Sequence, residues 1–512
     1  MNNQRLSLLA LTALLLATLA CNFPMRLARS VPEFTAEQLR QTVEAMPSPA
    51  PVEDQIGAAD VTPVSSEPFA PPTRNPTPEG TYFEYLTQPG DTLASLTGRF
   101  GFESGDLQLE PPMPMDAYLP VGQRLNIPDR LEELSPAQLL MPDAELVYSP
   151  AASDFDLQTY IQTADGYLAD HTELVEDEEE LNGVEIVRKV ASELSVNPRL
   201  LLAIIDLRSG WLFDSPPGAA DERYPLGFRI PGREGLYEEL RIAATQLNVA
   251  YYGWRVGDFT VIEFENGPAL RLHPTLNAGS VAVMHLFTYF SGWETWVDLL
   301  YGPQSLSFRY HNLFGDAWQR AASVGALLPA DLTEPELALP FRPGTDWSLT
   351  AGPHNAWNAG TPLGALDFAP VLIEARCAVS TAWVTASAPG VAVRARDNAV
   401  ALDLDGDGDE STGWVIIYYH IAARGMVGEG VFLEQDQLIG HPSCEGGRST
   451  GTHVHMARKF NGEWIPADGP VPWLMNGWRV QAGERIYAGK LVNGEQVVTA
   501  DPSGRAGSSI RR

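Results

Sequence analysis

Four histidines and one aspartate in the C-terminal part of the chain could together bind a metal ion and use it. His453 and His455 form a His-x-His pair in the segment GTHVH, which reads as a strand. Side chains at positions i and i+2 of a strand share a face, so both imidazoles can point at one site. The pair alone would equally suit ordinary packed or surface histidines, and the interpretation therefore depends on further partners.

His354 and Asp367 are the further partners that suggest a catalytic metal. Two histidines and one carboxylate are a known zinc set that leaves a fourth position for water, whose pKa then falls to about 7. A structural zinc site is usually closed by four protein ligands, and Cys377 and Cys444 are not spaced to complete one. We therefore expect zinc bound for catalysis.

Short β-segments must position these residues. After residue 345, the segments 391–396 and 399–405 alternate in pattern, and the segment 414–420 is rich in β-branched and aromatic residues. Turn signals lie between these segments. This pattern predicts an antiparallel β domain over 345–490, followed by a C-terminal tail over 491–512. With a mostly helical region before it, the chain is expected to be a multidomain α+β protein.

Residues 345–475 resemble the zinc endopeptidases of the lysostaphin and LytM type, which have the duplicated hybrid motif fold. Many members carry a His-x-x-x-Asp motif, but Leu363 stands four residues before Asp367 here. The beta-lytic branch instead places its histidine well upstream of a Leu-Asp-Phe segment, as His354 and Asp367 are placed. The segment GHPSCEGGRSTGTHVH, ending at His455, is similar to the closing strand of the family.

The resemblance implies a role for each residue. His354, Asp367 and His455 would bind zinc, and His453 would be the general base. His420, at the end of WVIIYYH, would stabilise the tetrahedral intermediate. The substrate would be the peptide cross-links or stem peptides of bacterial peptidoglycan. The alternative is a non-catalytic wall-binding protein that regulates other hydrolases, although such degenerate members usually lose a ligand and all five positions are present here.

Residues 81–129 form a compact segment that resembles a LysM domain, a βααβ module that binds N-acetylglucosamine in glycan chains. The resemblance rests on the motif GDTL at 90–93, on RFG at 99–101 and on a final strand at 122–128. Asp91 is expected to cap the first helix. A LysM fold that no longer binds glycan is the alternative, because the insertion PPMPMDAY at 111–118 is unusual.

Residues 153–325 alternate helical segments with turns, and Asn197 before Pro198 predicts a helix start. The segment VNPRLLLAIIDLRSGW resembles the first catalytic helix of lysozyme-like transglycosylases and glucosaminidases. Those enzymes need a glutamic acid where Arg208 stands, and a guanidinium cannot donate a proton at neutral pH. We therefore expect a degenerate, inactive lysozyme-like domain.

The N-terminus predicts export. An apolar run of 15 residues follows Arg5 and ends at Cys21, which resembles a bacterial lipoprotein signal over 1–21 with Cys21 lipidated. An ordinary signal peptide or an uncleaved anchor is the alternative. Residues 22–80 contain a Pro-rich stretch that reads as a tether. The protein is therefore expected on the outer face of the cytoplasmic membrane, held by its lipid.

Three further features complete the expectations. Cys377 and Cys444 suggest a disulfide that closes a loop of roughly 68 residues, worth about 4 kcal/mol, with two buried thiols as the alternative. The net charge of −31 without a basic cluster argues against nucleic acid as a partner. The acidic turn at 403–410 fits calcium only partly, because Trp414 stands where an EF-hand has its closing glutamate, and an acidic hairpin turn is favoured.

Overall fold

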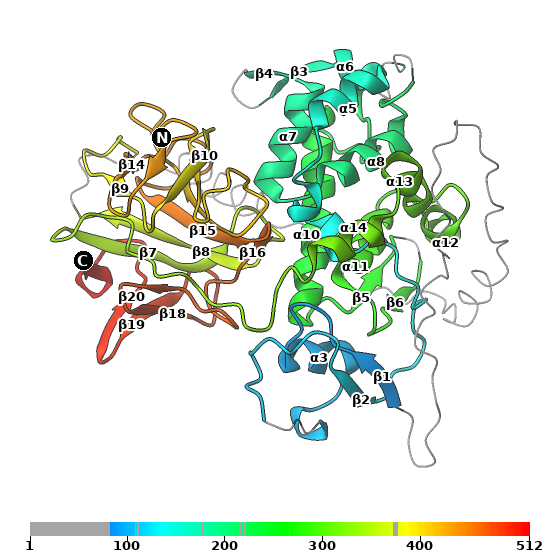
Figure 1. The fold of residues 1–512 in the computed structure, drawn as a ribbon, viewed down its shortest axis with the longest axis horizontal. Coiled ribbons are helices and arrows are strands. Elements are labelled where there is room, and N and C mark those ends of the chain that lie inside the picture. Colours follow the sequence, from blue (N-terminus) through cyan, green and yellow to red (C-terminus); the bar gives the residue numbers. More distant parts are fainter. Residues whose placement is uncertain are drawn as a thin grey trace, which may run out of the picture.

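The computed structural model describes residues 82–512, apart from 108, 110–111, 176–178, 215–217, 219–221, 266 and 372–376. A small module, a helical domain and a β domain follow one another along the chain (Figure 1). The expected signal with Cys21 and the tether lie outside the described residues. Within these residues, no helix has both the length and the apolar character needed to cross a membrane.

The small module, residues 82–128, pairs strand β1 (Tyr82–Leu86) antiparallel with β2 (Arg124–Pro128) around helix α3 (Leu93–Phe100). Thr92, and not Asp91, caps α3: its side chain accepts a hydrogen bond from the Ser95 N–H in a capping box. Asp91 instead accepts hydrogen bonds from the Tyr85 hydroxyl and the backbone of Gln88. The second helix expected of a βααβ module is the three-residue turn η1 (Ser104–Asp106).

The helical domain extends from α4 to α14 and packs around helix α10 (Leu236–Val256). Asn197 caps α8 by accepting a hydrogen bond from the Arg199 N–H, with Pro198 in the first turn as predicted. Beside α10, α8 and two short hairpins, the domain contains α4 (Asp143–Leu146), α5 (Leu157–Ala164), α6 (Tyr167–Asp170), α7 (Gly183–Leu194), α11 (Ala278–Phe287), α12 (Trp293–Tyr301), α13 (Leu306–Phe314) and α14 (Ala317–Val324). Helix α8 itself covers Pro198–Ser209 and is almost wholly buried.

A nine-stranded antiparallel sheet forms the centre of the β domain, in the order β13-β10-β11-β12-β15-β8-β7-β21. Strand β13 (Phe432–Leu433) is one edge, and β16 (Glu463–Trp464) pairs with β15. The three strands predicted from sequence are β10 (Gly390–Arg396), β11 (Ala399–Asp403) and β12 (Trp414–Tyr419). The remaining central strands are β7 (Asp346–Asn355), β8 (Leu363–Pro370) and β15 (Val454–Phe460). One face of this sheet packs on its own core and the other meets the helical domain, where Ala401, Ile417 and Ala457 join the helical core.

Residues 491–512 are not a tail, because they complete the β domain. A separate four-stranded sheet consists of β17 (Leu474–Met475), β18 (Trp478–Ala482), β19 (Gly489–Asn493) and β20 (Gln496–Thr499), with β20 at one edge. Strand β21 (Ser509–Arg511) then pairs with β7 at the edge of the central sheet. The boundary expected at 490 therefore falls inside the folded domain.

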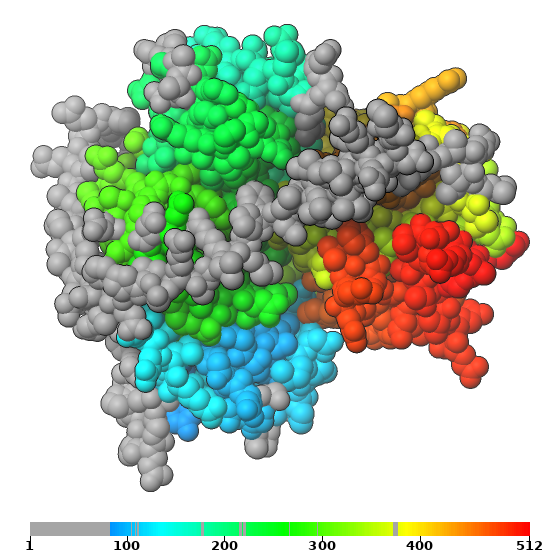
Figure 2. Space-filling view, turned by 180° about the vertical axis from the view of Figure 1, so that it is seen from behind, coloured from blue at the N-terminus to red at the C-terminus, as the bar shows by residue number. Residues whose placement is uncertain are grey.

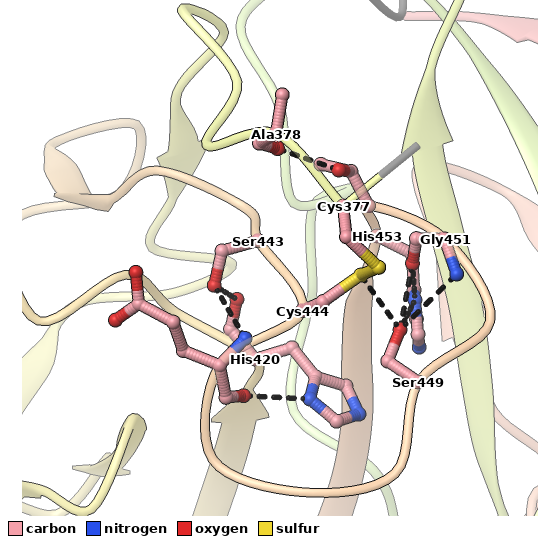
Figure 3. The surroundings of a disulfide bond; sticks show 10 residues. Cys377, Ala378, His420, Ser443, Cys444, Ser449, Gly451 and His453 are labelled. Carbon is pink, nitrogen blue, oxygen red and sulfur yellow. Dashed lines mark hydrogen bonds between the residues drawn. A yellow bond between two sulfur atoms is a disulfide. The ribbon is translucent and has the colours of Figure 1, made fainter. Parts of the chain in front are cut away.

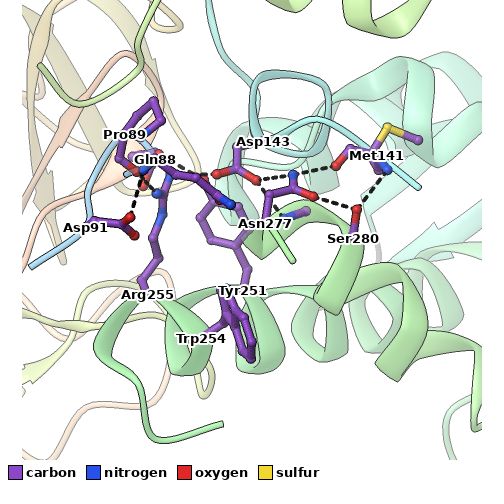
Figure 4. Close-up of polar contacts among 12 residues, drawn as sticks. Gln88, Pro89, Asp91, Met141, Asp143, Tyr251, Trp254, Arg255, Asn277 and Ser280 are labelled. Atoms are coloured by element: carbon purple, nitrogen blue, oxygen red, sulfur yellow. Dashed lines mark hydrogen bonds and ion pairs between the residues drawn. The ribbon is translucent and has the colours of Figure 1, made fainter. Parts of the chain in front are cut away.

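One largely buried arginine, Arg255 at the end of α10, joins all three parts of the protein. Its guanidinium donates to the Pro89 carbonyl in the small module and lies 3.1 Å from the Asp143 carboxylate in the helical domain (Figure 4). The same group is 2.5 Å from the Glu463 carboxylate in the β domain. Figure 2 shows the small module, in blue, lying directly against the helical domain, in green.

Candidate metal centre

Three neighbouring strands bring the predicted ligands together. Asp367 of β8 stands opposite His455 of β15, and His354 near the end of β7 stands opposite Ala365 of β8. His354 Nε2 lies 3.0 Å from His455 Nδ1 and 3.3 Å from Asp367 Oδ1. His455 Nδ1 is 3.4 Å from the same oxygen. The three residues thus form a His-Asp-His group that could hold a metal ion.

Backbone carbonyls determine which ring nitrogen of each ligand faces the centre. His354 Nδ1–H donates to the Gly352 carbonyl at 3.0 Å, and His455 Nε2–H donates to the Ala356 carbonyl at 2.9 Å. In each ring, the other nitrogen then carries a free lone pair. These nitrogens are Nε2 of His354 and Nδ1 of His455, and both face Asp367. A metal ligand needs this tautomer.

The spacing of the three ligand atoms suits zinc. In a tetrahedral zinc site with bonds of about 2.0 to 2.2 Å, ligand atoms stand roughly 3.3 to 3.5 Å apart. Asp367 Oδ1 is buried and accepts no well-aligned hydrogen bond from the described residues, so one coordination bond would satisfy it. Burial alone would raise the pKa of Asp367, but the imidazoles of His354 and His453 outweigh burial and hold this pKa well below its ordinary value. The carboxylate is therefore charged and ready to bind a cation.

The two remaining histidines, His420 and His453, lie beside this group, and Figure 3 shows both of them near the disulfide. His453 Nε2 is 3.5 Å from Asp367 Oδ2, and the rings of His453 and His420 are 4.7 Å apart. His453 Nδ1–H donates to the Gly451 carbonyl, and His420 Nδ1–H donates to the Glu445 carbonyl. Burial first, and then His453, lower the pKa of His420 to about 4. Both rings therefore present an Nε2 lone pair.

A disulfide joins Cys377 to Cys444, with an S–S distance of 2.14 Å. Cys444 follows Ser443, whose N–H donates to the His420 carbonyl and whose own carbonyl accepts from the His453 N–H. The bridge therefore anchors the loop that connects the two histidines, as Figure 3 shows. This is the disulfide that the two cysteines suggested from sequence.

Two aromatic residues beside the metal group were not singled out from sequence. Tyr487 lies 4.9 Å from the His354 ring, and its backbone has a φ of 70°, which is uncommon for a tyrosine. Trp357 lies 4.6 Å from Tyr419, the neighbour of His420. Neither residue belongs to a spaced motif, so the sequence offered no signal for them.

Two other predicted features lie away from this group. The oxygens of Asp403 accept hydrogen bonds from the backbone of 405, 406 and 408, which closes the acidic turn. The carboxylates of Asp403, Asp405 and Asp407 are close enough to share an ion, although exposed acidic turns commonly hold none. Arg208 lies over the Phe290 ring and donates to the Leu226 carbonyl, in a packing role.

The chain resembles known proteins over most of its length. A family model described as the N-terminal domain of LasA matches residues 139–329. Protease LasA of Pseudomonas aeruginosa is 26% identical over 382 residues, which cover 69% of this chain and 81% of that protein. The beta-lytic metalloendopeptidase of Lysobacter enzymogenes is 25% identical over 158 residues, 30% of this chain and 82% of that protein.

The solved structures that resemble the chain match only a part of it. The structure titled "A Novel M23 Metalloprotease Pseudoalterin from Deep-sea" is 23% identical, with a TM-score of 0.28, and covers 32% of this chain and 95% of that chain. The catalytic domain of lysostaphin from Staphylococcus simulans is 22% identical, with a TM-score of 0.18, and covers 25% and 89%.

Proposed function

We propose that this chain, a metalloendopeptidase homologous to protease LasA and the beta-lytic enzymes, uses zinc to hydrolyse the peptide part of bacterial peptidoglycan. The observation that carries the proposal is the His-Asp-His group, with both ring tautomers prepared for a metal and two more histidines beside it. A regulator without activity would not need this complete set.

His354, Asp367 and His455 would hold the metal. When bound there, zinc supplies Lewis acidity, which polarises a carbonyl group and makes a water molecule acidic. His453 accepts the proton of the attacking water at Nε2, because Nδ1–H is already committed to the Gly451 carbonyl. The same ring then passes this proton to the leaving amine.

His420 would stabilise the negative oxygen of the tetrahedral intermediate. Its Nδ1–H is committed to the Glu445 carbonyl, so a neutral ring can only accept at Nε2. Stabilising an oxyanion by donation therefore requires a second proton on His420. The rings of His420 and His453 are 4.7 Å apart, so the two imidazoles could share the proton taken from the water before it passes to the leaving amine.

The other parts of the chain would bring the enzyme to its substrate. We infer that the small module binds glycan as a LysM domain, which would raise the local concentration of cross-links near the zinc site. The helical domain would be a lysozyme-like scaffold without glycosidase activity, because of Arg208. A lipid at Cys21 would hold the exported protein on the membrane, and the disulfide supports export to an oxidising compartment.

The first experiment measures zinc content and peptidoglycan digestion for the wild type and for His455→Ala, with sugars and peptides analysed separately. We expect roughly one zinc per chain and peptide cleavage that both EDTA and the substitution abolish. Released sugar ends would instead indicate a glycosidase. A metal-free or inert wild type would favour the wall-binding regulator.

A further inference from the structure

A cavity of about 330 Å³ opens between the helical domain and the β domain, away from the metal group. Helix α7 forms one wall, and strand β10 with the turn at 408–410 forms the other. Two cross-domain contacts hold the walls together: Lys189 Nζ is 2.7 Å from Asp397 Oδ2, and Lys459 Nζ donates to the Ser192 carbonyl at 3.0 Å. Figure 1 shows α7 beside the β domain.

Most charged groups in the cavity wall already have partners. Arg394 makes a two-pronged contact with Glu410, at 2.8 and 2.9 Å, and Lys459 donates to the same carboxylate. Asp156 caps α5 by accepting from the backbone and hydroxyl of Thr159. Asp409 likewise accepts from the backbone and hydroxyl of Ser411. These groups maintain the shape of the cavity.

Two guanidinium groups in the wall are not used in this way. Arg188 of α7 is half-buried, and among the described residues no side chain forms a hydrogen bond or ion pair with its guanidinium. Within the part of the chain that the structure describes, the guanidinium of Arg396 on β10 has only a loose, exposed contact with Glu429 at 3.7 Å. Beside them, burial first, and then Glu410 and Asp409, raise the pKa of Tyr148 to about 12, so its hydroxyl remains a donor.

The cavity is connected to the active site through one hairpin. Arg396 begins this hairpin, and Asn398 within it exchanges hydrogen bonds with Ile421: its carbonyl accepts from the Ile421 N–H, and its side chain donates to the Ile421 carbonyl. Ile421 directly follows His420. Within the sheet, Ala399 pairs with Arg396 on one side and with Tyr419, the neighbour of His420, on the other, so Arg396 and His420 lie at the same end of the two strands that flank β11.

We propose that this cavity is a substrate subsite in which Arg188 and Arg396 bind a carboxylate group of the wall peptide. The inference rests on the proposed peptidase function and adds to it a preference for acidic peptides. Guanidinium groups suit this task because their N–H donors match the geometry of a carboxylate. The Tyr148 hydroxyl would contribute one further donor.

The test compares two substrates and matched variants of the full chain. The substrates are a cross-linked wall peptide with a free carboxylate and the same peptide amidated at that carboxylate. For Arg188→Gln/Arg396→Gln we expect KM for the acidic peptide to rise by roughly tenfold or more, with kcat unchanged. KM for the amidated peptide should not change. Arg479→Gln, an exposed arginine on β18 (Trp478–Ala482), is the control and should behave as the wild type.

A binding measurement covers the case in which the double variant is poorly folded. Calorimetry with the His453→Ala chain should show tighter binding of the acidic peptide than of the amidated one. Adding Arg188→Lys, which keeps the positive charge but loses the paired N–H donors of the guanidinium, should reduce the difference in affinity between the two peptides. Equal binding of both peptides, or unchanged KM values in a folded double variant, would overturn the subsite. A wild type that cleaves neither peptide would instead contradict the peptidase function.

Discussion

Replacing Arg255 with methionine should destabilise the whole assembly of three parts. The guanidinium is largely buried, with 11% of the side chain exposed, and is bonded to the Pro89 carbonyl, to the Tyr251 hydroxyl at 2.8 Å and to Glu463 at 2.5 Å. Removing one partner of a buried ion pair costs about 3 to 5 kcal/mol, because the other charge stays buried without compensation. Burial already raises the pKa of Glu463 despite Arg255, so its carboxyl would take up a proton and limit the loss to the lower end of this range.

Urea unfolding followed by tryptophan fluorescence measures this loss, and a double variant tests its cause. In Arg255→Met/Glu463→Gln no charge remains at 463, while the amide can still accept from Tyr251. We expect the double variant to recover about 2 kcal/mol relative to the sum of the two single variants. Arg479→Met, at an exposed site, should change stability by less than about 0.5 kcal/mol. Strict additivity of the two single effects would refute the reasoning.

Three further outcomes are expected. His453→Ala should lower kcat by roughly 10² to 10⁴-fold with zinc content unchanged, and equal loss of zinc would reassign the residue as a ligand. Arg394 and Lys459 overcome the effect of burial and lower the pKa of Glu410. The contribution of Glu410 to the free energy of unfolding is therefore present above about pH 4.5 and is lost as the pH falls. The difference in stability between the wild type and Glu410→Gln should accordingly become smaller in acid. A gap independent of pH would contradict this pairing. Reducing the disulfide should lower activity more than zinc content, since the bridge anchors the loop between the two histidines proposed for catalysis; a parallel loss of both would indicate global unfolding.

The local part of the site could be predicted because short-range rules govern it. Alternation along a strand places His453 and His455 on one face, and both rings are within 3.5 Å of Asp367. Residue chemistry suggests His354 and Asp367 as partners of the histidine pair, but only the resemblance assigns their roles, since no local rule brings β7, β8 and β15 together. The capping of α3 was wrong by one residue, because Asp91 is occupied by Tyr85 and Gln88.

Contacts between domains could not be predicted. Arg255 and Glu463 are charged residues that would normally be read as solvent-exposed, and only the meeting of three parts buries them. Likewise, the pattern places Ala457 on the same face as His455 but does not indicate that the helical domain covers it. Tyr487 reaches His354 through backbone hydrogen bonds with 352 and 353, and no side-chain pattern encodes such bonds.

Strand β21 has a consequence for biosynthesis. It forms the edge of the central sheet by pairing with β7, the strand that carries His354, and Arg512 is bonded to the carbonyls of Leu339 and Phe341 at the start of the domain. Since domains fold as units, the edge of this sheet is complete only once residues 509–511 have been made. A chain that is still being synthesised lacks both the strand beside β7 and the contacts of Arg512 with the start of the domain. The strand that carries His354 therefore gains its outer neighbour only after the rest of the sheet has been made.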